Sequence, residues 1–318
     1  MLAEEFEELL LGAPREWDRD GVAAQVGVDI ERASDLWAAL GFAEVPTGEL
    51  AFTRLDVEAL RTALDLSSSG VIEPEMLLVL ARAMGQGLAR LAEAQVEVFR
   101  GRAVGMSPDD VQAAAAGAAA EVLPRLEDLV VHVWRRHFAA AMERSLVALA
   151  ADGHPIQAVG FVDLVGFTRT SRDVQAAELT ELLERFERET ALRVTANGGR
   201  VVKTLGDGVL FVADTIAGAA EVALATAEAH ERDESIPEIR AGLALGPVLS
   251  RLGDVFGDPV NLASRLTEEA RPSSVLVDRI AAEALAGDGR FRLMSLKHRS
   301  VRGYRALRPH VLRRADSA

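Results

Sequence analysis

The chain has 318 residues, of which 49% are hydrophobic, and its formal net charge is −14. This length allows two domains with separate cores, and the composition is typical of a globular, soluble protein. The acidic balance argues against a main role in binding nucleic acid or an anionic membrane, and the absence of cysteine excludes disulfides, thiolate zinc sites and thiol nucleophiles. Because the first residues are acidic and no apolar run approaches the roughly 20 residues that span a bilayer, we expect a cytoplasmic protein.

The first half of the chain is predicted to be helical. Residues 29–42 form a short helix closed by Gly41. Thr53–Asp56 has the spacing of a capping box and precedes another helix. A long helix follows over about residues 73–100, and its predicted apolar face consists of Leu77, Leu80, Met84, Leu88, Leu91 and Val96. We therefore expect residues 1–152 to form an all-α helical bundle.

A last long helix is predicted from about residue 125 to 150, after Pro124. Its apolar residues repeat at threes and fours: Leu126, Leu129, Val130, Val133, Phe138, Ala141, Met142, Leu146 and Leu149. Such a stripe packs either on its own domain or against a second chain, and His132 and His137 lie beside it. Residues 151–155 end the helix without an obvious flexible linker. We interpret this helix as a coupling element through which the first domain regulates the second.

A DNA-binding alternative comes from residues 21–42, which resemble the helix-turn-helix part of some DNA-binding domains. Residues 15–54, however, contain eight acidic residues and four arginines. This is the wrong balance for a surface that faces phosphates. We therefore favour a packed helical bundle over a DNA-binding surface.

The second half, residues 153–318, alternates strands with helices. A strand over residues 156–163 delivers Asp163 at its end, and Gly206-Asp207-Gly208 forms the turn of a hairpin. The order β-α-β-β-α-β predicts a ferredoxin-like α+β core, in which the first strand and the hairpin are neighbours. Asp163 and Asp207 are then expected to meet at one edge. Two such carboxylates repel each other unless a divalent cation lies between them, and an all-oxygen ligand set favours Mg or Mn over Zn.

Weaker patterns predict the remaining elements of this half. Asp214 is expected to cap an alanine-rich helix that runs to about His230. Further strands are predicted near residues 239–245, 274–277, 290–295 and 301–312.

Three more polar residues stand out in this half. Lys203 lies in an otherwise apolar strand, where a buried ammonium without a partner is costly. A loop over residues 251–257 leads to Asp258-Pro259, a predicted cap and first-turn proline. The helix that they begin carries Asn261 and Arg265, and their i, i+4 spacing places both on one face.

Three motifs in this half resemble those of the class III nucleotidyl cyclase catalytic domain. They are residues 161–168 (FVDLVGFT), 203–208 (KTLGDG) and 254–265 (DVFGDPVNLASR). The resemblance covers about residues 156–312, and three motifs in the right order make it highly specific. With helices ahead of this domain, the layout is similar to that of actinobacterial adenylyl cyclases that carry an N-terminal regulatory domain.

The resemblance implies a role for each polar position. Asp163 and Asp207 would bind two divalent cations per site, Mg or Mn, with the backbone carbonyl of Leu164 as a further ligand. Lys203 and Asp254 would read adenine, because a lysine donor and a carboxylate acceptor complement its ring nitrogen and its amino group. In similar family members that use GTP, a Glu and Cys pair stands at these two positions. This chain has no cysteine, so the resemblance implies ATP as the substrate.

The resemblance also implies the reaction. Asn261 would orient the ribose and Arg265 would neutralise charge on the α-phosphate. The ribose 3′-hydroxyl would attack this phosphate in line, and ATP would become 3′,5′-cyclic AMP and pyrophosphate without a covalent enzyme intermediate. In the family, the metal aspartates and the other site residues come from opposite subunits, so a homodimer with two shared sites is expected.

One departure from the family concerns its last phosphate-binding lysine, which matches Arg302 here. Between Arg290 and Arg314 there are nine lysines or arginines and no acid. Arg302 is therefore a candidate triphosphate ligand, and a solvated basic strand is the alternative interpretation.

The individual residues also have ordinary structural interpretations. Lys203 could extend along the surface to solvent, Asp254 could be a loop acid, and Arg265 could form a surface ion pair. Their coincidence in motif order favours a site. Two other functions stay open: a catalytically silent nucleotide-sensing module and a nucleotide-responsive DNA-binding regulator. The complete set of motif positions argues against the silent module.

Overall fold

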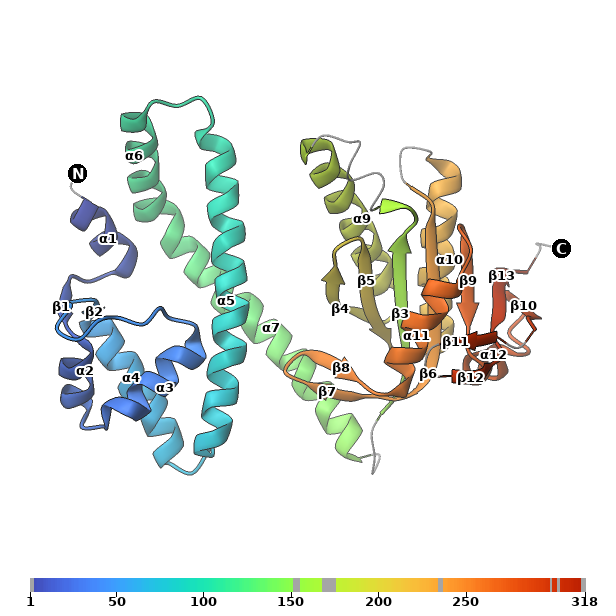
Figure 1. The fold of residues 1–318 in the computed structure, drawn as a ribbon, viewed down its shortest axis with the longest axis horizontal. Coiled ribbons are helices and arrows are strands. Elements are labelled where there is room, and N and C mark those ends of the chain that lie inside the picture. Colours follow the sequence, from blue (N-terminus) through green and yellow to red (C-terminus); the bar gives the residue numbers. More distant parts are fainter. Residues whose placement is uncertain are drawn as a thin grey trace. The chain divides into compact units, whose positions relative to one another are not determined.

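Figure 1 shows a computed structural model of the chain, which describes residues 3–150, 155–167, 176–233, 237–297, 299–301 and 304–315. Backbone contacts divide the chain into two compact units, Met1–Met142 and Glu143–Ala318, and each unit has its own hydrophobic core. None of the helices in the described residues is long and apolar enough to cross a membrane.

The first 150 residues are mainly helical, as expected. The helices are α1 (Ala3–Leu11), α2 (Arg19–Val26), α3 (Ile30–Leu40), α4 (Arg54–Ser68), α5 (Pro74–Ala103), α6 (Pro108–Gly117), the π-helix η1 (Ala118–Val122) and α7 (Leu123–Ala150). Two short strands, β1 (Arg15–Trp17) and β2 (Phe52–Thr53), pair antiparallel.

Local signals begin and end several of these helices. The Thr53 hydroxyl accepts hydrogen bonds from the N–H groups of Leu55 (3.1 Å) and Asp56 (3.4 Å), and the Asp56 carboxylate accepts one from the Thr53 N–H (2.7 Å). The predicted capping box is therefore confirmed. Gly41 ends α3 at a φ of 83°, in the left-handed region that favours glycine.

The core of the N-terminal unit lies between α2, α3, α4 and the start of α5. Val22, Leu36 and Leu60 are buried there, and the rings of Trp37 and Phe52 stack with their centroids 4.5 Å apart. A Cβ atom on Gly85 would lie 2.1 Å from the carbonyl oxygen of Leu40. The glycine thus lets the end of α3 approach the backbone of α5 closely.

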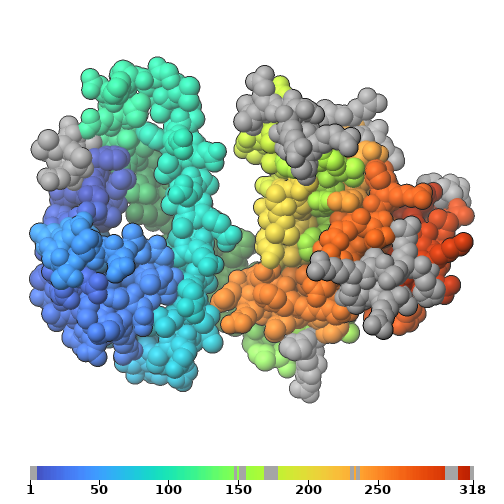
Figure 2. Space-filling view, viewed as in Figure 1, coloured from blue at the N-terminus to red at the C-terminus, as the bar shows by residue number. Residues whose placement is uncertain are grey.

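Two apolar stripes predicted from the sequence lie on the surface of the chain. On α5, Leu77 packs on the core, but five large side chains are at least 38% exposed: Leu80, Met84, Leu88, Leu91 and Val96. On α7, six are exposed: Leu129, Val133, Phe138, Met142, Leu146 and Leu149. Figure 2 shows α5 along the surface of the N-terminal unit. The chain by itself therefore leaves much of both stripes uncovered.

The start of the last helix differs from the expectation. We predicted that it begins after Pro124, but the chain is helical from α6 through η1 into α7. In the π-helix the N–H of Leu123 donates to the carbonyl of Ala118, one residue further back than in an α-helix. A widened turn directly before the proline accommodates a residue that has no N–H to donate.

The second unit is built on one large sheet. Its strands are β3 (Ile156–Leu164), β4 (Gly199–Leu205), β5 (Gly208–Ala213), β6 (Ile239–Pro247), β7 (Leu249–Arg251), β8 (Asp254–Phe256), β9 (Ser274–Val277), β10 (Phe291–Ser295), β11 (Arg299–Val301), β12 (Tyr304–Leu307) and β13 (His310–Arg314). Its helices are α9 (Ala176–Ala196), α10 (Ile216–Arg232), α11 (Asp258–Glu269) and α12 (Arg279–Leu285).

Seven of these strands form the sheet, in the order β10-β13-β9-β6-β3-β5-β4 (Figure 1). The segment from β3 to β6 has the predicted β-α-β-β-α-β order, and β3 pairs antiparallel with β5 on one side and β6 on the other. The expected α+β fold is confirmed.

The sheet is covered on both faces. Val162, Phe211 and Leu243 pack on one face with residues of α9, α10 and α12. Val159, Leu210 and Ala244 point to the other face, where α11 contributes Ala263 (Figure 1). This division follows from the period of two along each strand.

Four local expectations for this unit are corrected. The predicted loop 251–257 overlaps the β7–β8 hairpin, which runs from Leu249 to Phe256, so Asp254 begins a strand. At the start of α10, the Thr215 hydroxyl accepts from the N–H of Gly218 at 3.0 Å, and this capping contact comes from Thr215 rather than from Asp214.

At α11, the residue before the helix is Gly257, with no side-chain cap, and Asp258 is the first helical residue. The strand predicted over residues 301–312 is divided into separate strands that end at Leu307 and begin at His310. Pro309 lies between them, and a proline cannot donate to a strand ladder.

Candidate active site

The two acidic residues expected to meet do lie at neighbouring positions. Asp163, near the end of β3, is opposite Gly208 in the ladder with β5, and the N–H of Leu164 donates to the carbonyl of Asp207 at 3.0 Å. Burial raises the pKa of the Asp163 carboxyl above its ordinary value, and the nearby negative charge of Asp207 adds to this rise. The β4–β5 turn therefore brings the two acids together.

A third residue of this cluster was not identified from the sequence. Arg240 is opposite Asp163 in the ladder between β3 and β6, and its Nε (2.9 Å) and Nη2 (2.6 Å) both donate to Asp163 Oδ2. This contact lowers the pKa of Asp163 and partly opposes the effect of burial. The signal was available in principle, because Arg240 is a cation in an apolar strand, which is the feature that singled out Lys203.

Lys203 and Asp254 form a second pair, from β4 and β8. Lys203 Nζ lies 2.5 Å from Asp254 Oδ2, and the N–H of Val255 donates to Asp254 Oδ1 at 2.8 Å. A register irregularity in β4 lies between Val201 and Lys203, of the kind that re-aims a side chain. The two residues are 51 positions apart in the chain, so the fold alone makes them a pair.

The helix α11 carries the other two predicted residues. Asn261 is exposed, and its side-chain amide has no hydrogen-bond partner in the described part of the chain. Arg265 is half-buried, and its Nη1 donates to both carboxylate oxygens of Glu268, at 2.8 and 2.6 Å. Arg302 lies outside the described residues.

The predicted residues therefore occupy three places in the unit. Asp163, Asp207 and Arg240 lie where β3 meets the β4–β5 turn and β6, Lys203 pairs with Asp254, and α11 carries the asparagine and the arginine. Within the described residues, no hydrogen bond or ion pair joins Lys203 or Asp254 to either of the other two groups, whereas Arg240 Nη1 also donates to the backbone carbonyl of Glu268 on α11, at 3.3 Å.

Residues 151–314, about half of the chain, match the family model described as the adenylate and guanylate cyclase catalytic domain. The chain belongs to the adenylate and guanylate cyclase family. This cyclase is thus an enzyme of the phosphorus–oxygen lyase class, and the match spans β3 to β13 of the structure.

Three relatives of this cyclase are similar over most of its length. Each is named adenylate cyclase. The protein from Streptomyces coelicolor is 41% identical, over 99% of this chain and 90% of its own. That from Glutamicibacter nicotianae is 34% identical, over 98% and 82%, and that from Streptomyces griseus 42%, over 91% and 73%. The likeness therefore includes the helices ahead of the catalytic domain.

Cyclase domains of this family are generally metal-dependent, so the site must suit a cation. Within the described residues, no group of three or more histidine, cysteine or acidic side chains could hold a metal ion. Asp163 and Asp207 supply two carboxylates at neighbouring positions. This donor set fits Mg or Mn, which are commonly bound by one or two carboxylates together with water and substrate phosphates.

Proposed function

We propose that this cyclase converts ATP to 3′,5′-cyclic AMP and pyrophosphate. The observation that carries the proposal is the pairing of Lys203 with Asp254, at 2.5 Å, from strands of two different sheets. The names of the three relatives support the same substrate.

Lys203 and Asp254 would select the base. Adenine offers an acceptor at its ring nitrogen and a donor at its amino group, so the Lys203 ammonium and the Asp254 carboxylate complement it. Guanine would present a carbonyl to the carboxylate and an N–H to the ammonium, and both contacts would be unfavourable. The salt bridge between the two side chains positions donor and acceptor side by side before the nucleotide binds.

The reacting groups would be held by the remaining residues. Asn261 would orient the ribose, and Arg265 would leave Glu268 to neutralise charge on the α-phosphate. The ribose 3′-oxygen forms a bond to the α-phosphorus, the bond from that phosphorus to the bridging oxygen breaks, and pyrophosphate leaves. The hydroxyl proton passes to solvent or to a phosphate oxygen. Positioning and electrostatics would supply the rate.

Asp163 and Asp207, with the Leu164 carbonyl, would hold two divalent cations, Mg or Mn. When bound, these ions lower the pKa of the 3′-hydroxyl and compensate the charge of the polyphosphate. In their absence Arg240 supplies positive charge to Asp163. A guanidinium freed from a carboxylate is also well suited to phosphate, so Arg240 would then bind the polyphosphate. Arg302 is proposed as a further phosphate ligand.

The active site would be shared between two chains. The metal-binding acids and the base-reading residues form separate groups in the chain, without a hydrogen bond or ion pair between them in the described residues. We therefore propose a head-to-tail homodimer in which each of two sites takes its acids from one subunit and Lys203, Asp254, Asn261 and Arg265 from the other.

Regulation is assigned to residues 1–152, with catalysis in residues 153–318. In the sequence, α7, which ends at Ala150, is followed by β3, the strand that begins at Ile156 and carries Asp163. A change in the orientation of α7 would alter the register of the two catalytic subunits, and so the activity.

The experiment is an assay of the purified chain with Mn and either ATP or GTP, with identification of the product. We expect cyclic AMP from ATP, a strong preference for ATP, and a loss of at least about 100-fold in turnover for Asp207→Ala. Glu283→Gln, which removes an exposed acid paired with Arg279 on α12, is the matched control and should keep full activity. A chain that starts at residue 153 should differ from the full chain in specific activity. If Asp207→Ala turned over ATP as fast as the unsubstituted protein, the proposal would be contradicted.

A further inference from the structure

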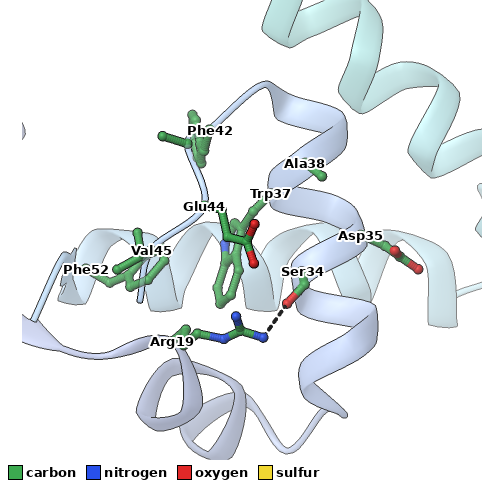
Figure 3. Close-up of a pocket in the computed structure, with 10 residues that line it drawn as sticks. Arg19, Ser34, Asp35, Trp37, Ala38, Phe42, Glu44, Val45 and Phe52 are labelled. Atoms are coloured by element: carbon green, nitrogen blue, oxygen red, sulfur yellow. Dashed lines mark hydrogen bonds between the residues drawn. The ribbon is translucent and has the colours of Figure 1, made fainter. Parts of the chain in front are cut away.

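A cavity of about 280 Å³ lies beside α3 in the N-terminal unit, far in the sequence from the catalytic residues (Figure 3). Its walls are largely apolar and aromatic: Trp37, Ala38, Phe42, Ala43, Val45 and Phe52. Trp37 and Phe52 are held in place by the core, whereas Phe42 is 54% exposed. Ligand pockets commonly measure roughly 300–1,000 Å³, so this cavity suits a small molecule rather than a long chain.

One cation with an unsatisfied donor lines the cavity. Arg19, the first residue of α2, donates from Nη2 to the Ser34 hydroxyl at 3.3 Å (Figure 3). Its Nε is buried and has no hydrogen-bond partner in the described chain. The described acceptors of the protein therefore do not satisfy this guanidinium fully, and none of them is an acid. A carboxylate is the natural occupant, since a guanidinium can donate to it through two parallel N–H groups.

Two acids also line the cavity, but they are not placed alike. In Figure 3, Asp35 points away from the cavity on the far side of α3, whereas Glu44 lies on the cavity side of that helix. Neither acid forms an ion pair with Arg19 in the described part of the chain. A simple anion that reached Arg19 would therefore also meet the negative charge of Glu44. A ligand with one positive and one negative group would match both.

We propose that this cavity binds an α-amino acid with an apolar side chain. Its carboxylate would accept hydrogen bonds from Arg19 and Ser34, and its ammonium group would pair with Glu44. The apolar side chain would lie against Trp37 and Phe52. The aromatic wall supplies contact area, and the two charges set the orientation of the ligand.

The first test measures binding to the full chain by calorimetry and by tryptophan fluorescence, since Trp37 lines the cavity. The probes are L-phenylalanine, L-leucine, 3-phenylpropanoate, which lacks the ammonium group, and 2-phenylethylamine, which lacks the carboxylate. We expect one saturable site per chain for at least one of the amino acids. Each single-charge analogue should bind at least about tenfold more weakly than L-phenylalanine, because a charged group of the protein is then left without its partner.

Variants assign the binding to this cavity. Arg19→Gln and Glu44→Gln should each weaken binding of the amino acid by about tenfold or more, and Glu44→Gln should improve binding of 3-phenylpropanoate. Asp35→Asn removes an acid of the same rim that points away, and it should bind as the unchanged chain does. Ala38→Phe fills the cavity from an exposed position, so it should abolish binding without affecting folding. Thermal unfolding of each variant checks the fold.

Several results would overturn the proposal. They are the absence of binding for both amino acids, equal affinity for L-phenylalanine and 3-phenylpropanoate, and unchanged binding by Ala38→Phe. All of these measurements are independent of cyclase turnover, so they do not depend on the proposed catalytic function.

Discussion

At the scale of single residues, the Lys203–Asp254 pair shows how the fold keeps a carboxylate charged. The two side chains are 40% and 30% exposed. Partial burial acts to raise the pKa of Asp254, but hydrogen bonds from Lys203 Nζ and the Val255 N–H outweigh it and hold the pKa below its ordinary value. Asp254 therefore remains an acceptor throughout the neutral range, which a base-reading role needs.

This lowered pKa predicts the pH dependence of stability. A carboxyl whose folded pKa is depressed stabilises the fold above its unfolded pKa, about 3.9, and this stabilisation is lost as the pH falls through the folded pKa. Lys203→Met should thus lower the unfolding temperature at neutral pH, and its difference from the unchanged chain should shrink below about pH 4. Thermal unfolding across a pH series measures this.

The matched control for that series is Arg279→Met, which breaks a pair with Glu283 whose side chains are 66% and 62% exposed. Such exposed pairs contribute little, so we expect almost no difference at any pH. A difference for Lys203→Met that stays constant into acid would be inconsistent with the role given to the pair.

At the scale of elements, the position of α11 against the sheet depends on one glycine. A Cβ atom on Gly242 of β6 would lie 2.4 Å from both the Ala263 carbonyl oxygen and the Thr267 backbone nitrogen. The backbone of α11 is therefore as close to the strand as a residue without a side chain permits. Because α11 carries Asn261 and Arg265, this contact also sets the position of two candidate catalytic residues.

Gly242→Ala should consequently affect both stability and turnover. The added methyl group must displace helix backbone, which costs about 1–3 kcal/mol in well-packed regions, and the shift of α11 should lower cyclase activity. Gly289→Ala is the control, because no atom lies within 4 Å of its added Cβ. Denaturant unfolding and the cyclase assay measure the two effects. If Gly242→Ala lost no more activity than Gly289→Ala, the helix position would not limit catalysis.

At the scale of the whole molecule, the proposed site requires two chains. In each chain, the metal-binding acids would serve one of the two sites, and the residues on β8 and α11 would serve the other. A defect in one set of a chain therefore leaves its other set functional. Shared sites of this kind differ from two independent monomers in a measurable way.

Mixing two inactive variants distinguishes these arrangements. Asp207→Ala and Arg265→Ala, mixed in equal amounts and allowed to exchange subunits, should recover about a quarter of the activity, because half of the dimers then hold one intact site of two. Asp207→Ala mixed with Asp163→Ala should recover nothing, because both changes damage the same set. Recovery in neither mixture, despite demonstrated subunit exchange, would exclude the shared site.

The sequence by itself determined what depends on neighbours along the chain. The capping box at Thr53, the glycine end of α3 and the two-residue period of the strands are local, since their hydrogen bonds and side-chain directions involve residues a few positions apart. The order of strands and helices also sufficed to predict that Asp163 and Asp207 meet, because a ferredoxin-like core places the first strand beside the hairpin.

Only the tertiary structure decided which distant side chains touch and which surfaces stay open. Arg240 meets Asp163 across 77 residues because β3 and β6 pair in one particular register. Many apolar residues of α5 and α7 remain exposed, and Arg19 lines an aromatic cavity, because of how the helices pack. Periodicity indicates that a face is apolar, but what covers it depends on long-range packing, which no local pattern encodes.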